Sequence, residues 1–139
     1  MSTKELRLIP AESAAQELLG YEVGEAMDGT GFCRFEIQPK HINSVGAVHG
    51  GFVGVLLDTA SGATARLHLD RETFPPVITV SLTINYIAPA KSGRVIARGK
   101  VTGGGRKLLF VTSSLEDENG QMLATSNGVF RRVARKTEG

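Results

Sequence analysis

The sequence is poor in cysteine and tryptophan: Cys33 is the single cysteine of 139 residues, and tryptophan is absent. One cysteine excludes an internal disulfide and fits a reducing compartment, so we expect a cytoplasmic protein. Residues 1–10 contain no apolar stretch, so we expect neither a signal peptide nor a membrane-spanning segment. The net charge of +2 is too small to favour a nucleic-acid-binding protein.

Glycine, by contrast, is abundant. Seventeen glycines occur in a chain whose charged fraction (22%) and hydrophobic fraction (41%) are those of an ordinary globular protein. So many glycines indicate tight turns, or backbone that another group approaches closely. The length allows one hydrophobic core, and we expect a single domain over residues 1–139.

The spacing of apolar residues predicts an α+β fold, with an antiparallel sheet packed on one central helix. The composition of residues 11–19, which end before Gly20, indicates a short helix, and three- and four-residue steps indicate a long helix over about 49–67. Alternation and turn signals predict strands over residues 22–27, 32–38, 77–88, 94–102, 107–116 and 121–133, the last four forming a meander. Residues 134–139 form a polar tail that we expect to be frayed.

Asp58 is the one formally charged residue between positions 41 and 65. On a helix that begins at His49, the large apolar side chains lie within about 80° of the His49 direction, and Asp58 lies about 180° away. Its neighbours on that face are all small: Gly51, Gly54, Ser61, Gly62 and Ala65. Glycine within a helix costs about 0.8–1 kcal/mol relative to alanine, and a solvent-exposed face normally carries longer polar residues. This face therefore predicts close packing against a second body, either another subunit or a ligand.

Two interpretations of Asp58 follow. It is a structural carboxylate that hydrogen-bonds a loop or caps a helix, or it is a partly desolvated base or nucleophile at an interface. The bare face around it favours the second interpretation.

The stretch His49-Gly50-Gly51 stands where the long helix begins. The first N–H groups of a helix have no internal acceptor and point along the positive end of the helix dipole. Gly50 has no side chain to block access, so its N–H can bind a carbonyl oxygen that becomes negative. The alternative is a flexible helix start at which glycine only permits the turn. Asn43, six residues before His49, is by itself typical of a turn.

A metal site is not indicated. The three histidines, His41, His49 and His68, show no ligand spacing with carboxylates, and no Cys-x-x-Cys pair exists. Residues 103–105 are glycines, but they lack the strand–loop–helix context of a phosphate-binding loop. We interpret Cys33 as a small core residue within a strand.

The spacing of residues 43–58 is more specific than any of its parts: it contains Asn43-x-x-Gly46-x-x-His49-Gly50-Gly51, and then Asp58 nine residues after the histidine. Together with residues 80–90, VSLTINYIAPA, this pattern resembles the hotdog-fold acyl-CoA thioesterases, above all the phenylacetate-pathway (PaaI-like) group. The resemblance covers about residues 15–132. It implies a hotdog fold, in which a curved antiparallel sheet wraps the long helix. It also implies that two subunits join their sheets edge to edge and share active sites at the interface.

The resemblance implies roles for five residues. Asp58 acts on water as a general base or attacks the thioester directly, and the Gly50 N–H binds the thioester oxygen. His49 orients or polarises the thioester, Asn43 positions the reacting groups, and Thr79 holds the attacking water. The implied enzyme is an acyl-CoA thioesterase that needs no metal or organic cofactor. It is expected to form a homodimer or a dimer-of-dimers homotetramer, with no nucleic-acid or membrane partner.

Two alternatives keep the fold. A hotdog enoyl- or hydroxyacyl-CoA hydratase is expected to carry an aspartate and a histidine in one short loop, which this chain lacks. A non-catalytic acyl-CoA-binding module is expected to have lost the acid, which is present as Asp58. Five basic residues are candidates for contacts with the CoA phosphates, although a solvated surface explains each equally well: Lys91, Arg106, Lys107, Arg131 and Arg132.

Overall fold

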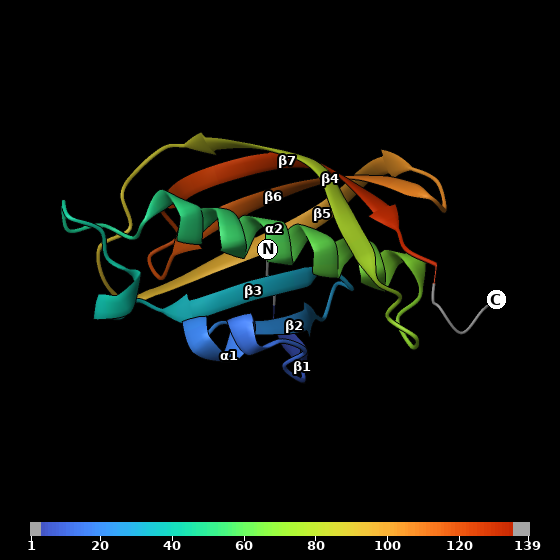
Figure 1. Cartoon of the computed structure of the whole chain (residues 1–139), viewed down its shortest axis with the longest axis horizontal. Coiled ribbons are helices and arrows are strands. Elements are labelled where there is room, and N and C mark those ends of the chain that lie inside the picture. The colour runs from blue at the N-terminus through green and yellow to red at the C-terminus, as the bar shows by residue number, and fades with distance from the viewer. Residues whose placement is uncertain (1–3, 135–139) are drawn as a thin grey trace.

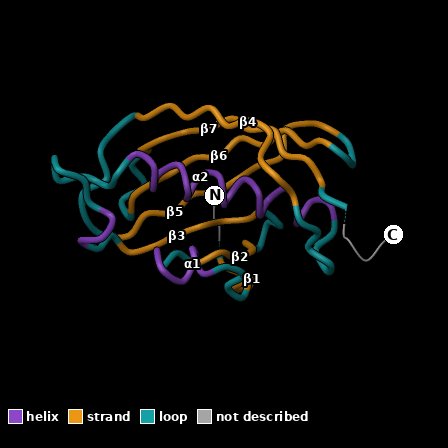
Figure 2. The backbone as a smooth tube through the Cα atoms, viewed as in Figure 1, coloured by secondary structure: helices purple, strands orange, loops and turns teal. Residues whose placement is uncertain are grey.

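The structure, a computed structural model, describes residues 4–134, which form one seven-stranded antiparallel sheet curved around a long helix (Figures 1 and 2). The elements are β1 (Glu5–Ile9), α1 (Ala14–Leu19), β2 (Glu22–Ala26), β3 (Gly31–Glu36), the short 3-10 helix η1 (Pro39–His41), α2 (Gly50–Leu69), β4 (Val77–Tyr86), β5 (Arg94–Gly104), β6 (Leu108–Asp117) and β7 (Met122–Arg132). Across the sheet the strands lie in the order β1-β2-β3-β5-β6-β7-β4. The predicted α+β hotdog fold is confirmed. Residues 135–139 of the predicted polar tail lie outside the described residues.

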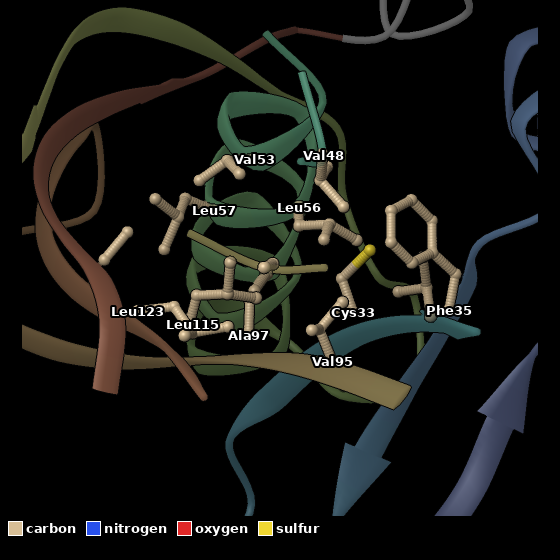
Figure 3. Packing of buried hydrophobic residues seen from close by; sticks show 14 of the residues in the cluster. Cys33, Phe35, Val48, Val53, Leu56, Leu57, Val95, Ala97, Leu115 and Leu123 are labelled. Carbon is tan, nitrogen blue, oxygen red and sulfur yellow. The ribbon is translucent and has the colours of Figure 1, made fainter. Parts of the chain in front are cut away.

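Helix α2 forms the core because its apolar face lies against the sheet. Leu56, Leu57 and Ala60 have no exposed surface, and full burial of a leucine side chain contributes about 1.5–3 kcal/mol. They belong to one cluster with inward residues of β3, β5, β6 and β7, which include Cys33, Val95, Ala97, Leu115 and Leu123 (Figure 3). Burial raises the pKa of the Cys33 thiol, which is a small core residue as predicted.

Both predicted helices are present, with shifted ends. Helix α1 begins at Ala14 because Ser13 caps it, its hydroxyl accepting the N–H of Gln16 at 3.1 Å. It ends at Gly20, whose φ of 78° suits glycine. Helix α2 runs two residues beyond its predicted end, to Leu69. Within residues 4–134, no helix combines the length and apolarity needed to cross a membrane.

Strand β1 is absent from the sequence-based prediction. Its pairing with β2 places it at an edge of the sheet, where Leu6 and Leu8 are both exposed. No alternation of buried and exposed side chains therefore marks this strand.

The predicted meander of four strands is wrong for β4. Strands β5, β6 and β7 do follow one another, but β4 pairs with β7 at the far edge, and β5 pairs with β3. Residues 87–93, which join β4 to β5, are longer than a tight hairpin turn requires. The N–H groups of Ile87 and Ala88 continue along β7 by donating to the carbonyl oxygen of Leu123. Strand β4 thus crosses α2 and ends the sheet (Figure 1).

A buried carboxylate joins the first strands to the loop after α2. Glu25 on β2 has no exposed surface and accepts hydrogen bonds from Arg7 on β1, at 2.8 Å, and from Arg71. These bonds, above all that from Arg71, hold the pKa of Glu25 below its ordinary value of 4.5. The ion pairs therefore connect three segments that are distant in sequence.

Candidate active site

Asp58 lies on α2, partly exposed, beside the first half of β4. The hydroxyl group of Thr79 on β4 donates a hydrogen bond to Asp58 Oδ1 at 2.7 Å. A β-bulge between Thr79 and Ser81 shifts the register of β4 against β7 at this point, and bulges commonly redirect a side chain. Two of the five predicted site residues are thus in contact, although 21 positions separate them in the sequence.

A cavity of about 270 Å³ opens beside Asp58 and Thr79. Its other walls come from α1 and nearby residues, from α2, and from the segment that leads into β4; Tyr21, Arg66 and Phe74 are among them. Arg66 is held in place by the Phe74 carbonyl oxygen at 2.8 Å, and its guanidinium group lies 3.5 Å from the centre of the Phe74 ring. Burial raises the pKa of the Tyr21 phenol, so this wall presents a neutral hydroxyl group. A small group bound in the cavity would lie next to the carboxylate.

Two glycines on the face around Asp58 pack against this chain's own strand β4, and Ser61 shares a hydrogen bond with Ser113 on β6, which corrects the prediction of another subunit or a ligand. A Cβ atom on Gly54 would lie 3.4 Å from Ile84, and one on Gly62 would lie 3.8 Å from Val77. Both neighbours are on β4. The side chains on this face of α2 are small where β4 folds back over the helix. A helical wheel does not show contacts with other elements.

The start of α2 brings His49, Gly50 and Gly51 together. His49 is the N-cap residue, and its Nδ1 accepts the Gly51 N–H at 2.9 Å. This bond leaves the proton of the neutral ring on Nε2, where it donates to none of residues 4–134. The Gly50 N–H has no hydrogen-bond acceptor in the same described range either. Two donors at a helix N-terminus are therefore available to an oxygen atom.

Gly50 is not required by the space within its own chain. The three atoms nearest to a Cβ atom there would be those of Tyr86, at 3.4–3.5 Å, which is ordinary contact, and the φ of Gly50 is not among the positive values. A glycine that neither sterics nor backbone conformation demands favours backbone left open for a ligand over a flexible turn.

Asn43 shapes the loop before α2. Its side-chain oxygen accepts the N–H groups of Val45 at 3.0 Å and Ala47 at 3.2 Å. Among the described residues, no hydrogen bond connects it to Asp58, His49 or Thr79. The structure thus shows Asn43 as a turn residue.

The other histidines do not join this group. His41 is buried; its Nδ1 accepts the Gln38 N–H at 3.0 Å, and its Nε2 lies 2.8 Å from the Leu19 carbonyl oxygen. It connects η1 to the end of α1. His68 is exposed on the last turn of α2. Across residues 4–134, no three His, Cys, Asp or Glu side chains lie close enough to hold a metal ion.

Tyr86 is a residue of the site that sequence analysis did not find. Its hydroxyl group donates to the Gly50 carbonyl oxygen at 2.8 Å, and its ring lies against Gly50. In the sequence, Tyr86 is only the last apolar member of an alternating strand. The available signal for its role was the change from aliphatic residues to tyrosine at the last position of this strand face.

Within one chain the site residues form two separate groups. Asp58 and Thr79 meet beside the beginning of β4, whereas His49 and Gly50 lie beside its end, at Tyr86. Asp58 lies nine positions after His49, which corresponds to about 13 Å along the helix axis. A carboxylate and two helix N-terminal donors without a partner among residues 4–134 are both present, but this distance keeps them apart within one chain.

A larger cavity, of about 770 Å³, lies elsewhere, on the face of the sheet turned away from α2. Arg98, Lys100, Glu116 and Asn127 are among its lining residues, and none of the five predicted site residues belongs to it. Size alone would therefore direct attention away from Asp58.

Comparisons with known proteins show the family of this chain. A sequence model of the thioesterase superfamily matches residues 45–124, a segment that contains Asp58, His49, Gly50 and Thr79 but not Asn43. Acyl-coenzyme A thioesterase 13 from Homo sapiens is 31% identical over 101 residues, which cover 71% of this chain and 70% of the human protein.

Solved structures of similar shape include a Bacillus halodurans protein crystallised with CoA. It is 25% identical, with a TM-score of 0.78, and the match covers 92% of this chain and 83% of that one. The E. coli PaaI protein from the phenylacetic acid degradation operon has a TM-score of 0.76 at 18% identity, over 88% of this chain and 86% of PaaI. The likeness to PaaI is one of fold.

Proposed function

Since this chain belongs to the thioesterase superfamily, we propose that it hydrolyses the thioester bond of acyl-CoA in sites shared between two copies of the chain. It is a thioester hydrolase. The specificity for acyl-CoA is supported by the name of the human relative and by the CoA bound to the Bacillus halodurans structure. The observation that carries the proposal is the hydrogen bond between Thr79 and Asp58 on the wall of a cavity.

In the proposed reaction Asp58 acts on water. The Thr79 hydroxyl group holds Oδ1, so Oδ2 remains to accept a proton from the attacking water. The water oxygen bonds to the thioester carbon, and the C–S bond then breaks. The acyl group leaves as a carboxylic acid, and the CoA sulfur leaves as a thiol that takes up the proton.

Direct attack by Asp58 is the other reaction that this placement allows. The carboxylate would form a mixed anhydride with the acyl group and release CoA, and water would then cleave the anhydride. Single turnover in ¹⁸O-labelled water tests for the anhydride: label in the Asp58 carboxylate requires an anhydride that water cleaves at the Asp58 carbon, whereas both routes can give label in the acid product.

The negative charge that develops on the thioester oxygen is stabilised at the start of α2. The Gly50 N–H, at the positive end of the helix dipole, binds the thioester oxygen as it becomes negative, and His49 Nε2–H donates beside it. We propose that Asn43 positions this loop. The cavity beside Asp58 receives the acyl group, since it opens next to the carboxylate.

Pairing of two β4 strands would unite the two groups. Strand β4 pairs only with β7 within the described residues, so one edge of a ten-residue strand carries unpaired backbone groups. If two copies pair antiparallel about a two-fold axis between Leu82 and Thr83, Thr79 lies opposite the partner's Tyr86. Asp58 of one copy then lies near Gly50 of the partner subunit, because Thr79 binds the first and Tyr86 binds the second.

We further propose that two such dimers associate into a homotetramer. The sheet face turned away from α2 exposes Ile78, Leu108 and Phe110, and exposed apolar side chains on an uncovered face favour an interaction surface. Light scattering measures the mass of the assembly in solution.

A cytoplasmic location and a reaction without metal or organic cofactor complete the proposal, since Cys33 is a buried thiol and the chemistry uses a carboxylate, water and backbone donors.

Thiol release from a panel of acyl-CoA esters tests the function. A colorimetric thiol reagent reports free CoA, and Cys33 adds no background because it is buried and its pKa is raised. We expect release with the wild type and a loss of at least about 10³-fold in Asp58→Asn, with melting temperature and assembly unchanged.

Three outcomes contradict the proposal. Water addition to enoyl-CoA without thiol release indicates a hydratase, and binding of acyl-CoA without turnover indicates a binding module. Activity retained in Asp58→Asn contradicts the assigned role of the carboxylate.

A further inference from the structure

We infer that Tyr86 is a positioning residue that fixes the direction of the Gly50 N–H, an inference that rests on the proposed function. Its hydroxyl group donates to the Gly50 carbonyl oxygen at 2.8 Å. The residues near Gly50 in the sequence do not predict this contact, since 36 positions separate Gly50 from Tyr86.

The peptide unit between Gly50 and Gly51 is held at both ends. Tyr86 binds its carbonyl oxygen, and His49 Nδ1 accepts its N–H at 2.9 Å. A peptide unit is planar, so two contacts at opposite ends fix the orientation of the plane.

The preceding peptide unit, which carries the Gly50 N–H, is held at its carbonyl end. The His49 carbonyl oxygen at its other end accepts the N–H groups of Phe52 at 2.9 Å and Val53 at 3.2 Å. With one plane held at both ends and the other at its carbonyl end, the two torsion angles of Gly50 are restricted. Two adjacent glycines would otherwise leave this turn more freedom than any other residue pair.

This rigidity matters for the reaction because an oxyanion donor stabilises charge best when it needs no reorientation. The N–H end of the unit between His49 and Gly50 has no partner of its own within residues 4–134, so its direction depends on the position of the Gly50 Cα atom, which the Gly50–Gly51 plane holds. Tyr86 is assigned no bond to the thioester or to the attacking water. It acts through Gly50.

Strand β4 is the physical link between the two groups of the site. Thr79 near its beginning binds Asp58, and Tyr86, seven residues on, binds Gly50. Tyr86 has room for its ring because its neighbour across the sheet is the small Ala124. Side chains of one strand, β4, therefore hold both the Asp58 carboxylate and the peptide unit next to the Gly50 N–H. This is the same strand that we propose to pair across the dimer.

Tyr86→Phe tests the inference, since it keeps the ring and removes the hydroxyl group. We expect kcat to fall about three- to tenfold, the effect of one neutral hydrogen bond, while KM, melting temperature and mass in solution stay at wild-type values. Thr102→Val is the matched control: this exposed hydroxyl group also donates to a backbone carbonyl, that of Phe110 at 3.3 Å, but on β5, which carries none of the five predicted site residues. It is expected to keep the wild-type kcat.

A second measurement does not depend on activity. The ¹⁵N order parameters of the Gly50 and Gly51 amides are expected to decrease in Tyr86→Phe and to stay unchanged in Thr102→Val. An unchanged kcat in an assembled Tyr86→Phe protein overturns the inference. So does an unchanged order parameter, or a loss of activity that disappears once the folded fraction is taken into account. Absence of thiol release from every substrate in the wild type would instead count against the proposed function, and the order parameters would still decide about Tyr86.

Discussion

Mixing two inactive variants tests whether two chains share each site. Asp58→Asn removes the carboxylate, and His49→Ser removes the imidazole donor while retaining a residue that caps helices well. In a heterodimer of these variants, one site combines the intact Asp58 with the intact His49 of the partner subunit. The other site carries both substitutions.

The expected magnitude follows from this geometry. Random exchange in an equal mixture makes about half of the dimers mixed, and each mixed dimer has one intact site of two, so about one quarter of wild-type activity returns. A heterodimer isolated with two different affinity tags is expected to reach about half. Thiol release from one acyl-CoA, normalised to protein concentration, measures both values.

A second pair of variants provides the control. Asp58→Asn and Thr79→Val damage the same group of the site, because the two side chains bind each other within one chain. Their mixture leaves no intact site in any dimer, so no activity is expected to return. An isolated Asp58→Asn/His49→Ser heterodimer that stays as inactive as its parents would refute the shared site, and recovery in the control pair would refute the grouping of residues.

Two further predictions concern single positions. Gly50→Ala is expected to leave stability unchanged or raised by up to about 1 kcal/mol while lowering kcat at least about tenfold, because the methyl group stands beside the N–H; Gly54→Ala, on the same helix beneath β4, is expected to keep activity. Equal activity in the two variants, compared by thiol release and thermal melting, would argue against an oxyanion role for Gly50. Glu25→Gln is expected to lower the melting temperature at pH 7 by several degrees, because Arg7 and Arg71 lose their carboxylate. The pKa of Glu25 is depressed by folding, so its stabilisation is present above its ordinary pKa of 4.5 and is lost as the pH falls below that value. The gap between the two melting curves is therefore expected to close in acid, and a gap independent of pH would contradict this assignment.

Sequence periodicity was sufficient for most elements because each depends on nearby residues. The three- and four-residue steps of α2 and the alternation of β4 follow from local geometry, and both elements were predicted within two residues of their observed ends. Periodicity did not predict strand β1, because its leucines are exposed at an edge of the sheet. The predicted place of β4 was also wrong, because pairing with β7 rather than β5 depends on where the chain goes after Tyr86.

The candidate site divides in the same way. Spacing along one helix placed His49 and Gly50 at its start and Asp58 well away from them, on a different face. The contact between Thr79 and Asp58 and the hydrogen bond from Tyr86 to Gly50 required β4 to fold over α2.

The abundance of glycine shows the difference most clearly. Local geometry explains Gly20, where a positive φ ends a helix. Sequence alone could not say what lies above Gly54 and Gly62, and the tertiary structure places their own strand β4 there. By itself, the sequence determined the two helices, most of the strands and the chemistry available to this protein, because those follow from residue type and from neighbours within a few positions. Only the tertiary structure decided which long-range neighbours meet, because packing of β4 across α2 depends on the whole chain.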